Sequence, residues 1–250
     1  MPTTEDFPIV SNVPRLTTDQ MREVDRAMIE DFHISLVQMM ENAGCNLAHL
    51  ACVRFLGGDP AGKPVVVLAG TGGNGGGALV AARHLHNRGA RLRVVVTKSA
   101  EAFTPVPAHQ LDVVRRMGVD IVEAGAIEHI QGRVDVVLDG IIGYSLSGPP
   151  RGAAAHLIRW ADARDTPVLS LDVPSGLDAT SGTVYDPAVR AAAILTLALP
   201  KQGLFSPAAA AYTGERYLAN ISVPPGLYAS IDPALDPGPL FAASSIVRLS

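Results

Sequence analysis

The sequence is poor in the residues that mark several common classes of protein. It has only two cysteines in 250 residues, Cys45 and Cys52, and they lie seven positions apart in a segment of helical pattern. Two helical turns separate such residues by about 10 Å, which is too far for a disulfide, so we expect two reduced thiols in the core. Lys and Arg number 20 against 24 Asp and Glu, and they form no basic run. A nucleic-acid partner is therefore not expected.

Long apolar runs are also missing. No segment approaches the roughly 20 apolar residues that span a membrane, and the run 191–200 has only the length of a strand. Residues 1–14 carry acids and prolines where a signal peptide has a basic start and an apolar run. We therefore expect a cytoplasmic protein without a membrane partner. Hydrophobic residues make up 48% and charged residues 18%, a composition typical of a folded domain rather than a disordered chain.

What the sequence contains is an alternation of helical and strand patterns. Two helices are predicted first, at 15–31 and at about 34–55, and a β-branched strand follows at 65–69. Further strands are predicted at 92–96, 120–122, 134–138, 168–171, 192–199 and 217–221, and further helices at 78–87, 107–117 and 153–163. This alternation predicts an α/β fold, a Rossmann-like three-layer α/β/α sandwich with a mainly parallel sheet and two N-terminal helices.

We predict three regions along the chain. Residues 1–14 form an N-terminal extension, residues 15–224 form one α/β domain, and residues 225–250 form a tail rich in proline and alanine.

Ligands of parallel sheets bind beyond the carboxyl ends of the strands, and a glycine-rich loop follows the first predicted strand. Six of the eight residues in 70–77 are glycine. Such a loop lets the backbone approach a ligand closely, and the start of the next helix favours an anion. The loop lacks the Gly-Lys-Ser/Thr of a P-loop. We predict a cradle for a phosphate-bearing molecule, with a tight turn without ligand as the alternative.

Two later strands each end at an aspartate, Asp139 and Asp172, and Ser175 follows the second one closely. Asp139, Ser175 and Asn74 are oxygen donors, and no His or Cys has metal-ligand spacing, so a metal here would be hard or weakly held and not zinc. The alternative is that each Asp caps its own loop. Lys201 follows another strand, where it meets a phosphate, serves acid–base chemistry if it is desolvated, or remains a solvated loop residue.

Together these loops resemble those of a known family. Residues 70–85 look like the GPGNNGGDGLVAARHL segment of NAD(P)H-hydrate epimerases, the YjeF N-terminal domain family. The segment 41–44 resembles the family's ENAG helix. Residues 139–143, 172–176 and 200–203 resemble its DAxxG, DxPSG and PKxG loops, in the same order along the chain.

The resemblance implies a Rossmann-like fold, a homodimer and an isomerase activity. The activity is the interconversion of R and S forms of hydrated NADH or NADPH (NADHX and NADPHX), which a separate dehydratase then repairs. It also implies a potassium ion bound by Asn74, Asp139 and Ser175, and it makes Asp172 the candidate for handling the proton of the C6 hydroxyl. The predicted substrate contacts are Gly73, Asn74, Gly75, Gly76, Gly77, Gly143, Tyr144, Ser145, Leu146, Ser147, Gly148, Pro149, Asp172 and Lys201.

The sequence departs from the family pattern at the ligand loops. Gly77 stands where the family has the Asp of NNGGDG, Gly73 replaces its first Asn, and Tyr144-Ser145 replaces its usual Thr-Gly. Two alternatives to an epimerase therefore stay open. One is a non-catalytic binding or interaction domain of the same fold, and the other is an enzyme acting on a different nucleotide or phosphorylated metabolite.

Overall fold

The computed structural model describes residues 7–250, so residues 1–6 of the expected N-terminal extension lie outside the described part. Within it, nine strands form one sheet in the order β1-β9-β8-β7-β6-β5-β2-β3-β4. The strands are β1 (Ile9–Val10), β2 (Pro64–Ala69), β3 (Arg91–Val96), β4 (Asp120–Glu123), β5 (Val136–Gly140), β6 (Val168–Leu171), β7 (Ala193–Leu197), β8 (Glu215–Ala219) and β9 (Ile246–Leu249).

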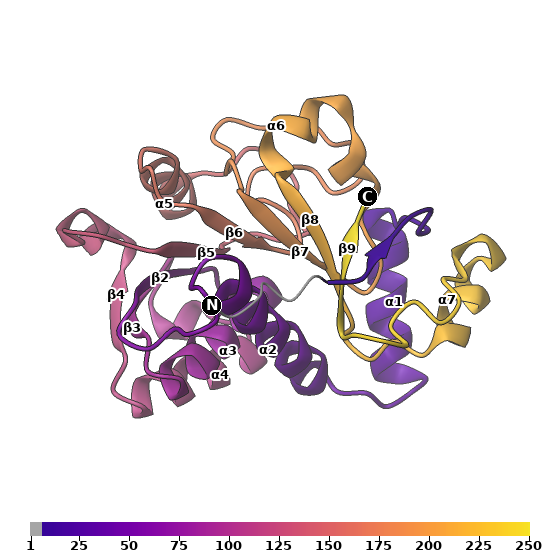
Figure 1. Cartoon of the computed structure of the whole chain (residues 1–250), viewed down its shortest axis with the longest axis horizontal. Helices are drawn as coiled ribbons and strands as arrows, with labels where there is room; N and C mark the ends of the chain where they lie inside the picture. Colours follow the sequence, from indigo (N-terminus) through magenta and orange to yellow (C-terminus); the bar gives the residue numbers. More distant parts are fainter. Residues whose placement is uncertain (1–6) are drawn as a thin grey trace.

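Helices cover both faces of this sheet (Figure 1). The α-helices are α1 (Thr18–Glu30), α2 (Leu36–Arg54), α3 (Gly73–Asn87), α4 (Pro105–Arg116), α5 (Gly152–Asp162), α6 (Ala210–Thr213) and α7 (Pro225–Ile231). Short 3₁₀ helices are η1 (Ala100–Ala102), η2 (Ala124–His129), η3 (Gln202–Phe205), η4 (Pro207–Ala209) and η5 (Pro233–Leu235). Figure 1 places α2, α3 and α4 on one face, α5 and α6 on the other, and α1 with α7 beyond one end.

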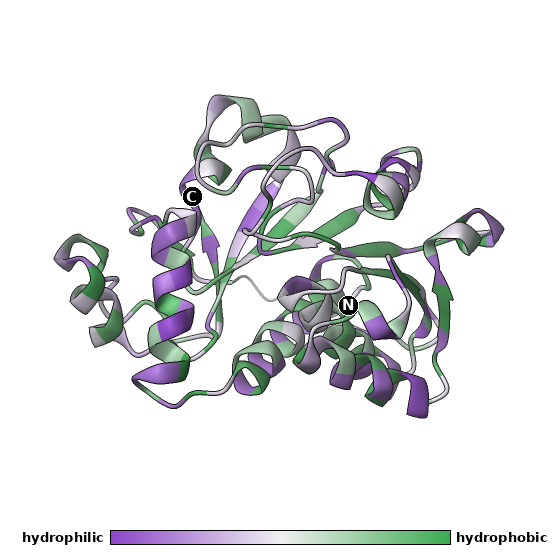
Figure 2. Ribbon diagram, turned by 180° about the vertical axis from the view of Figure 1, so that it is seen from behind, coloured by the Kyte–Doolittle hydropathy of each residue, from purple (hydrophilic) through white to green (hydrophobic). Residues whose placement is uncertain are grey.

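The predicted three-layer, mainly parallel α/β architecture is confirmed. Every strand pair is parallel except β8 with β9. β2 shows why the sequence predicts this, because its β-branched residues are buried on both faces of the sheet. Val65 and Val67 pack in the core under α2, α3 and α4, and Val66 packs in the core that includes α5. Figure 2 shows the same pattern, with hydrophobic central strands and polar outer faces of the helices.

The boundaries of two elements beside the predicted loops differ from expectation. The sequence predicts that the third helix begins at Ala78, but α3 begins at Gly73 and takes in most of the glycine loop. Glycine is a poor helix former, which is why the pattern favours a loop there. β5 includes Asp139 and Gly140, which the sequence places just after the strand.

Both ends of the described chain join the sheet. β1, from the segment expected as an extension, pairs in parallel with β9, and β9, from the segment expected as a tail, pairs antiparallel with β8. Ile246, Val247 and Leu249 of β9 are buried. α7 packs against α1 in a third hydrophobic cluster that includes Met28 and Leu227. The segments that flank the predicted domain therefore contribute to its core.

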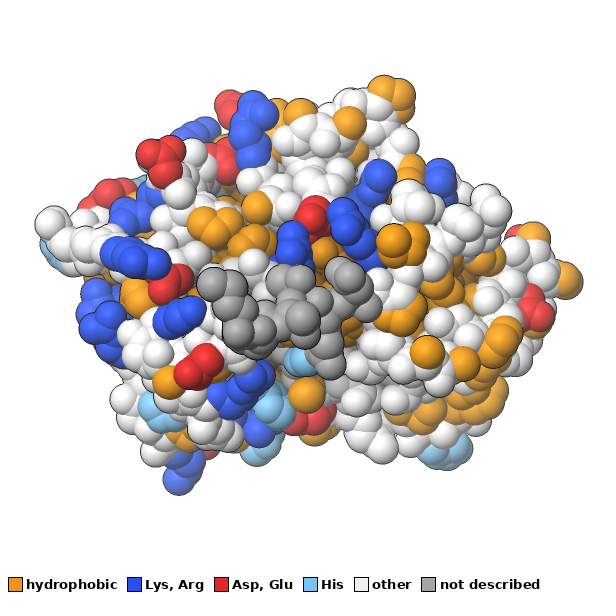
Figure 3. All heavy atoms as spheres, in the orientation of Figure 1, with side chains coloured by type: hydrophobic (Ala, Val, Ile, Leu, Met, Phe, Trp, Pro, Cys, Tyr) orange, Lys and Arg blue, Asp and Glu red, His pale blue; other side chains and the backbone are white. Residues whose placement is uncertain are grey.

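Two further sequence expectations concern the surface. Cys52 is buried and free, as expected, but Cys45 is exposed, so the prediction of two core thiols is wrong for one of them. Cys45 lies on the outer side of α2, where its neighbours include the half-exposed Glu41 and Asn42. In residues 7–250 no helix is both long and apolar enough to cross a membrane. Figure 3 shows basic and acidic side chains interspersed over the face of Figure 1.

Candidate functional site

The candidate site lies where two neighbouring strands lead the chain to opposite faces of the sheet. β2 pairs with β3 on one side and with β5 on the other. The chain leaves β2 for α3 and leaves β5 for α5, and these helices cover opposite faces (Figure 1). A crevice forms at such a switch point, outside the carboxyl ends of the strands. The predicted ligand loops begin here, after β2, β5 and β6.

The glycine segment brings the start of α3 to this edge. A Cβ at position 75 would lie 1.9 Å from the carbonyl oxygen of Gly70, so only glycine allows the helix to approach the end of β2 so closely. The N-cap residue, Gly72, makes no side-chain cap, which leaves the first backbone N–H groups without that partner. The N-terminal end of a helix carries a partial positive charge. This end of the pocket therefore favours an anionic group of a ligand.

Asp139 and Ser175 form a buried hydrogen-bonded cluster behind the site. Oδ1 of Asp139 accepts hydrogen bonds from Ser175 Oγ at 2.6 Å and from the backbone N of Ile141 at 3.2 Å. Oδ2 accepts from Ser170 Oγ at 2.8 Å and from the backbone N of Ser175 at 2.9 Å. Burial raises the pKa of Asp139, while these hydrogen bonds act to lower it. The cluster joins the ends of β5 and β6.

Asn74 lies on the pocket side of this cluster, in the first turn of α3. Its Oδ1 packs against Gly143, where an added Cβ would lie 3.1 Å away. The next residue back, Ile142, donates its backbone N–H to Ser175 Oγ at 2.9 Å. Asn74 Nδ2 is buried and has no hydrogen-bond partner within residues 7–250. Asn74 is thus linked to the Asp139–Ser175 cluster through the neighbouring residues Gly143 and Ile142. Of the three predicted metal ligands, Asn74 has an unsatisfied polar atom.

Asp172 stands at the end of β6 and faces the pocket. Its Oδ1 accepts hydrogen bonds from Lys201 Nζ, from Thr196 Oγ1 at 3.3 Å and from the backbone N of Leu197 at 3.3 Å. Lys201 is fully buried and also donates to the carbonyl oxygen of Leu197 at 2.8 Å. The backbone of Asp172 has a φ of 66°, which is costly for a residue with a Cβ. In the described part of the chain no group donates to Oδ2, so this oxygen is available to a ligand.

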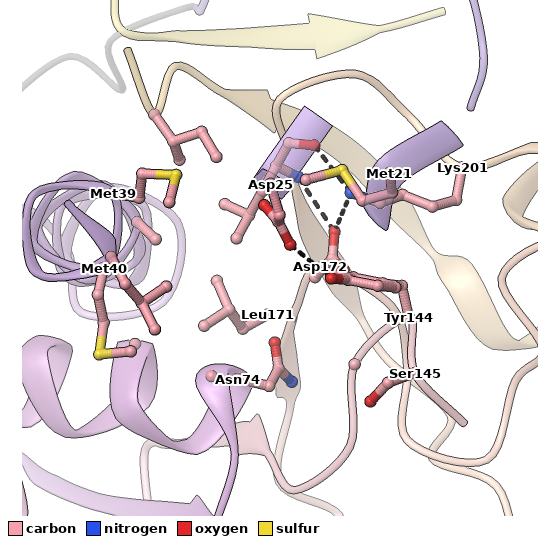
Figure 4. Close-up of a pocket in the computed structure, with 17 residues that line it drawn as sticks. Met21, Asp25, Met39, Met40, Asn74, Tyr144, Ser145, Leu171, Asp172 and Lys201 are labelled. Atoms are coloured by element: carbon pink, nitrogen blue, oxygen red, sulfur yellow. Dashed lines mark hydrogen bonds and ion pairs between the residues drawn. The ribbon is translucent and has the colours of Figure 1, made fainter. Parts of the chain in front are cut away.

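A second carboxyl group, which the sequence interpretation missed, enters the pocket from α1. Asp25 Oδ2 accepts a hydrogen bond from the hydroxyl of Tyr144 at 2.5 Å. Figure 4 shows Asp25, Tyr144, Asp172 and Lys201 gathered on one side of the pocket. One sequence signal points to Asp25. It lies four residues after Met21 and three before Met28, within the apolar stripe of an amphipathic helix.

The opposite side of the pocket is apolar. Met39, Met40 and Leu171 line it, and Figure 4 shows Met39 and Met40 across from the carboxyl groups. The cavity volume is about 170 Å³. The pocket therefore has an apolar wall, a polar wall and the start of a helix at one end.

Position 77 belongs to the apolar wall. A Cβ at Gly77 would lie 2.7 Å from Cδ2 of Leu171, so the leucine occupies the space that a side chain at 77 would need. The carboxylate that the family pattern places at 77 thus has no room here unless Leu171 moves. The replacement of the family aspartate by Gly77 is thus accompanied by the packing of Leu171 into the space beside it.

The structure brings only part of the predicted contact set to the pocket. Gly73, Asn74, Gly77, Gly143, Tyr144, Ser145, Asp172 and Lys201 line it. Gly75 and Gly76 are buried where α3 packs against its neighbours, and Leu146, Ser147, Gly148 and Pro149 continue along the loop beyond the pocket lining. The additional lining residues include Met21, Asp25, Leu36, Met39 and Met40, from the two N-terminal helices.

Comparison with protein families finds a match that covers most of the chain. The family model described as "YjeF-related protein N-terminus" matches residues 36–203. This range contains α2, α3 and the three ligand loops, but it does not include α1, which supplies Asp25.

Comparison with individual proteins finds relatives of two lengths. The chain is 44% identical over 213 residues to an NAD(P)H-hydrate epimerase of Dehalogenimonas lykanthroporepellens, covering 85% of this chain and 84% of that protein. It is 31% identical over 221 residues to a bifunctional NAD(P)H-hydrate repair enzyme, Nnr, of Moorella thermoacetica, covering 86% of this chain but only 42% of the relative. A crystal structure of yeast YNL200c has the same fold, with a TM-score of 0.80 at 24% identity over 95% of this chain and 100% of that one.

Proposed function

The chain belongs to the YjeF-related N-terminal family, and from that premise we propose that it is an NAD(P)H-hydrate epimerase, an isomerase that interconverts the R and S forms of NADHX and NADPHX. The observation that carries the proposal is the shared pocket in which Asp172, the start of α3 and an apolar wall meet. A hydrated nicotinamide nucleotide has a reacting hydroxyl, phosphates and a largely apolar ring, and each of these has a counterpart there.

Asp172 is the residue that we propose handles the proton of the C6 hydroxyl. Its Oδ1 is held by Lys201, Thr196 and the backbone of Leu197, so the carboxylate is fixed in place. Its Oδ2 is left for the substrate. A carboxylate within hydrogen-bond reach of a hydroxyl contributes general acid–base catalysis of about 10²–10⁴-fold. In this proposal Lys201 is a positioning residue, since its ammonium group is already committed to Asp172 and to the carbonyl oxygen of Leu197.

The phosphates of the nucleotide are proposed to lie at the start of α3. Gly73, Asn74 and Gly77 line the pocket from this helix, and Gly143, Tyr144 and Ser145 line it from the loop after β5. Backbone N–H groups at a helix N-terminus bind anions without the need for a basic side chain. This supports the predicted contacts that line the pocket from both segments, whereas Gly75, Gly76 and residues 146–149 lie outside its lining.

We also propose that the site binds a potassium ion, because the residues present fit one. Asn74, Asp139 and Ser175 offer only oxygen donors, which suits a hard cation and excludes a soft one. The buried Nδ2 of Asn74 lacks a partner, and a half-turn of the amide would place Oδ1 in that position, toward a cation. Asp139 already accepts four hydrogen bonds, so rotation of the Ser175 hydroxyl would free an oxygen for the ion. When bound, the ion would supply positive charge close to the phosphates.

A second function is favoured by one observation, the apolar contact at position 77. Because Leu171 fills the space beside Gly77, the pocket lacks the carboxylate of the family pattern on that wall. This favours a domain that binds a nucleotide without epimerising it, or an enzyme with a different nucleotide substrate. The retention of Asp172 with its buried partner Lys201 favours the epimerase.

The relatives suggest how the reaction product is used. The chain spans about two fifths of the bifunctional repair enzymes that it matches. We propose that a separate dehydratase acts after this protein on the S form. A homodimer and a cytoplasmic location complete the proposal, and both remain predictions from the sequence.

The test is a coupled assay with purified protein. An R-enriched hydrate of NADH is supplied with a separate S-specific dehydratase, and the formation of NADH is followed by absorbance. The epimerase proposal requires consumption of the R form faster than its spontaneous epimerisation, and loss of that acceleration in Asp172→Asn. Absence of acceleration overturns it. A nucleotide-induced rise in melting temperature without acceleration would instead support the non-catalytic binding domain.

A further inference from the structure

The unexplained carboxyl group of the pocket is Asp25. It comes from α1, outside the residues that match the family model, and it lines the pocket beside Met21. The Tyr144 hydroxyl donates to its Oδ2. No group within residues 7–250 donates to its Oδ1, which is left to meet a ligand. A partly buried carboxyl group with one free oxygen in a ligand pocket has the geometry of an acid–base residue.

The two carboxyl groups of the pocket have different surroundings. Asp172 is paired directly with the ammonium group of Lys201. Asp25 has no such direct partner, and its pKa is raised, chiefly by burial and further by the charge of Asp172, against the lowering effects of Tyr144 and Lys201. Pockets that hold one paired carboxylate and one protonatable carboxyl group can give and take protons in the same cycle.

Other charged and titratable groups face this pair. Burial and the neighbouring Asp25 raise the pKa of Tyr144, against a lowering effect of Arg22 from α1. Tyr228 of α7 is buried, and the charge of Asp25 adds to the rise in its pKa. Both tyrosines therefore stay protonated at neutral pH, whereas the pKa of Asp25 is raised from the ordinary range of an aspartate.

Position 77 gives a second, independent observation. The wall that would carry the family carboxylate is apolar here, because Leu171 fills the space beside Gly77. Tyr144, which holds Asp25, is itself a departure from the family pattern. The protein thus lacks the family carboxyl group at position 77 of α3 and has instead the carboxyl group of Asp25 on α1, which accepts a hydrogen bond from Tyr144.

We propose that Asp25 is the second acid–base residue of this site, acting with Asp172 on the hydrated nicotinamide ring. This inference rests on the proposed epimerase function. Asp25, protonated at Oδ1, gives its proton to the C6 hydroxyl. The C6–O bond breaks, its electron pair leaves with the water, and the lone pair of N1 forms a double bond to C6.

Return of water completes the exchange of configuration. A water oxygen forms a bond to the opposite face of C6, the π electrons return to N1, and the proton of that water passes to Asp172 Oδ2. Asp172 then loses this proton to solvent and Asp25 regains one, so the enzyme returns to its starting state. The reverse reaction uses the same two groups in exchanged roles.

The test uses the coupled assay on the full chain. Asp25→Asn removes the proton but keeps the size and the ability to accept from Tyr144, and we expect kcat to fall by about 100-fold or more with KM changed less than about threefold. Asp31→Asn is the matched control, an exposed aspartate at the end of the same helix, and it should retain the activity of the parent protein. Melting temperatures of both variants verify that they fold.

Tyr144→Phe supplies the second readout. Loss of the Tyr144 hydrogen bond removes an influence that lowers the pKa of Asp25. The alkaline limb of the kcat–pH profile should therefore move to higher pH in Tyr144→Phe and be missing from the residual activity of Asp25→Asn. Activity of Asp25→Asn within about twofold of the parent, or a rise in KM with unchanged kcat, overturns the role of Asp25 and leaves the epimerase standing. An inactive parent protein overturns both.

Discussion

Gly77 and Leu171 are predicted to be energetically coupled. The perturbation is Gly77→Ala, which adds one methyl group in the first part of α3. That methyl carbon would lie 2.7 Å from Leu171 Cδ2, with the next contact, Ala43 Cβ, at an ordinary 3.9 Å. The structure therefore points to a single side chain as the source of strain. Leu171→Val removes that carbon, because valine has no Cδ atoms.

The expected magnitudes follow from two opposing effects. Alanine in place of glycine within a helix stabilises by about 1 kcal/mol, whereas overpacking of a buried side chain costs about 1–3 kcal/mol. Gly77→Ala alone should therefore destabilise the protein by about 1 kcal/mol. In the Leu171→Val protein the overlap is absent, and the same change should stabilise by up to about 1 kcal/mol. The coupling energy is then about 2 kcal/mol, within the range seen for residues in contact.

The assay is a double-mutant cycle measured by urea unfolding. Gly73→Ala is the control, because it lies in the same helix and a Cβ there meets nothing within 4 Å. Its effect should be the same with Leu171 or Val at position 171. If the effect of Gly77→Ala also agrees in both backgrounds within about 0.3 kcal/mol, the leucine does not fill the space of the missing side chain and the reasoning fails.

Three further predictions test other parts of the structure. Because the pKa of Asp25 is raised in the folded protein, its contribution to stability is present at low pH and is lost as pH rises through that pKa. Asp25→Asn should thus raise the melting temperature more at about pH 8 than at about pH 4, close to the ordinary pKa of an aspartate, and equal shifts would contradict this. Ser175→Ala leaves Asp139 short of a hydrogen bond and should cost about 1–3 kcal/mol in urea unfolding. The same change should abolish any rise in melting temperature given by potassium chloride over choline chloride, and an unchanged rise would exclude Ser175 as a ligand. Truncation after Pro224 removes α7 and β9, whose apolar residues are buried, and should abolish cooperative thermal unfolding; a truncated chain that melts cooperatively would show that the tail is dispensable.

The sequence predicts the central sheet well because its strands are buried on both faces. Continuous β-branched runs such as 65–69 arise from that burial, and the carboxyl ends of parallel strands must meet at one edge. The prediction that Asn74, Asp139, Asp172 and Ser175 lie near one another depends only on these two facts. Their arrangement into two clusters, with Asp139 and Ser175 behind the pocket and Asp172 facing it, requires side-chain geometry that spacing does not contain.

Other features were not predictable from spacing for identifiable physical reasons. Asp25 lies between Glu23 and Arg26 on a helix with many charges, so it has the appearance of a solvated residue unless its place in the apolar stripe is noticed. The start of α3 at Gly73 contradicts helix propensity, and the close approach of the helix to Gly70 requires the glycine at position 75. β9 follows a proline-rich segment, and its pairing with β8 is a long-range contact that no local pattern indicates.

The arrangement of the pocket explains how the absence of the family carboxylate at position 77 is compatible with the proposed proton transfers. Met39 and Met40 of α2 and Leu171 of β6 are the apolar side chains of the pocket, whereas polar groups gather around Asp25 and Asp172 (Figure 4). A hydrated ring bound between these walls gains from apolar burial on one side, and in the proposed reaction its hydroxyl edge faces the other. A carboxylate at position 77 would lie within the apolar wall, where desolvation disfavours its charge. Replacing it with glycine packed by leucine therefore removes a buried charge from the binding wall, and in the proposed reaction the two aspartates on the polar side carry out the proton transfers.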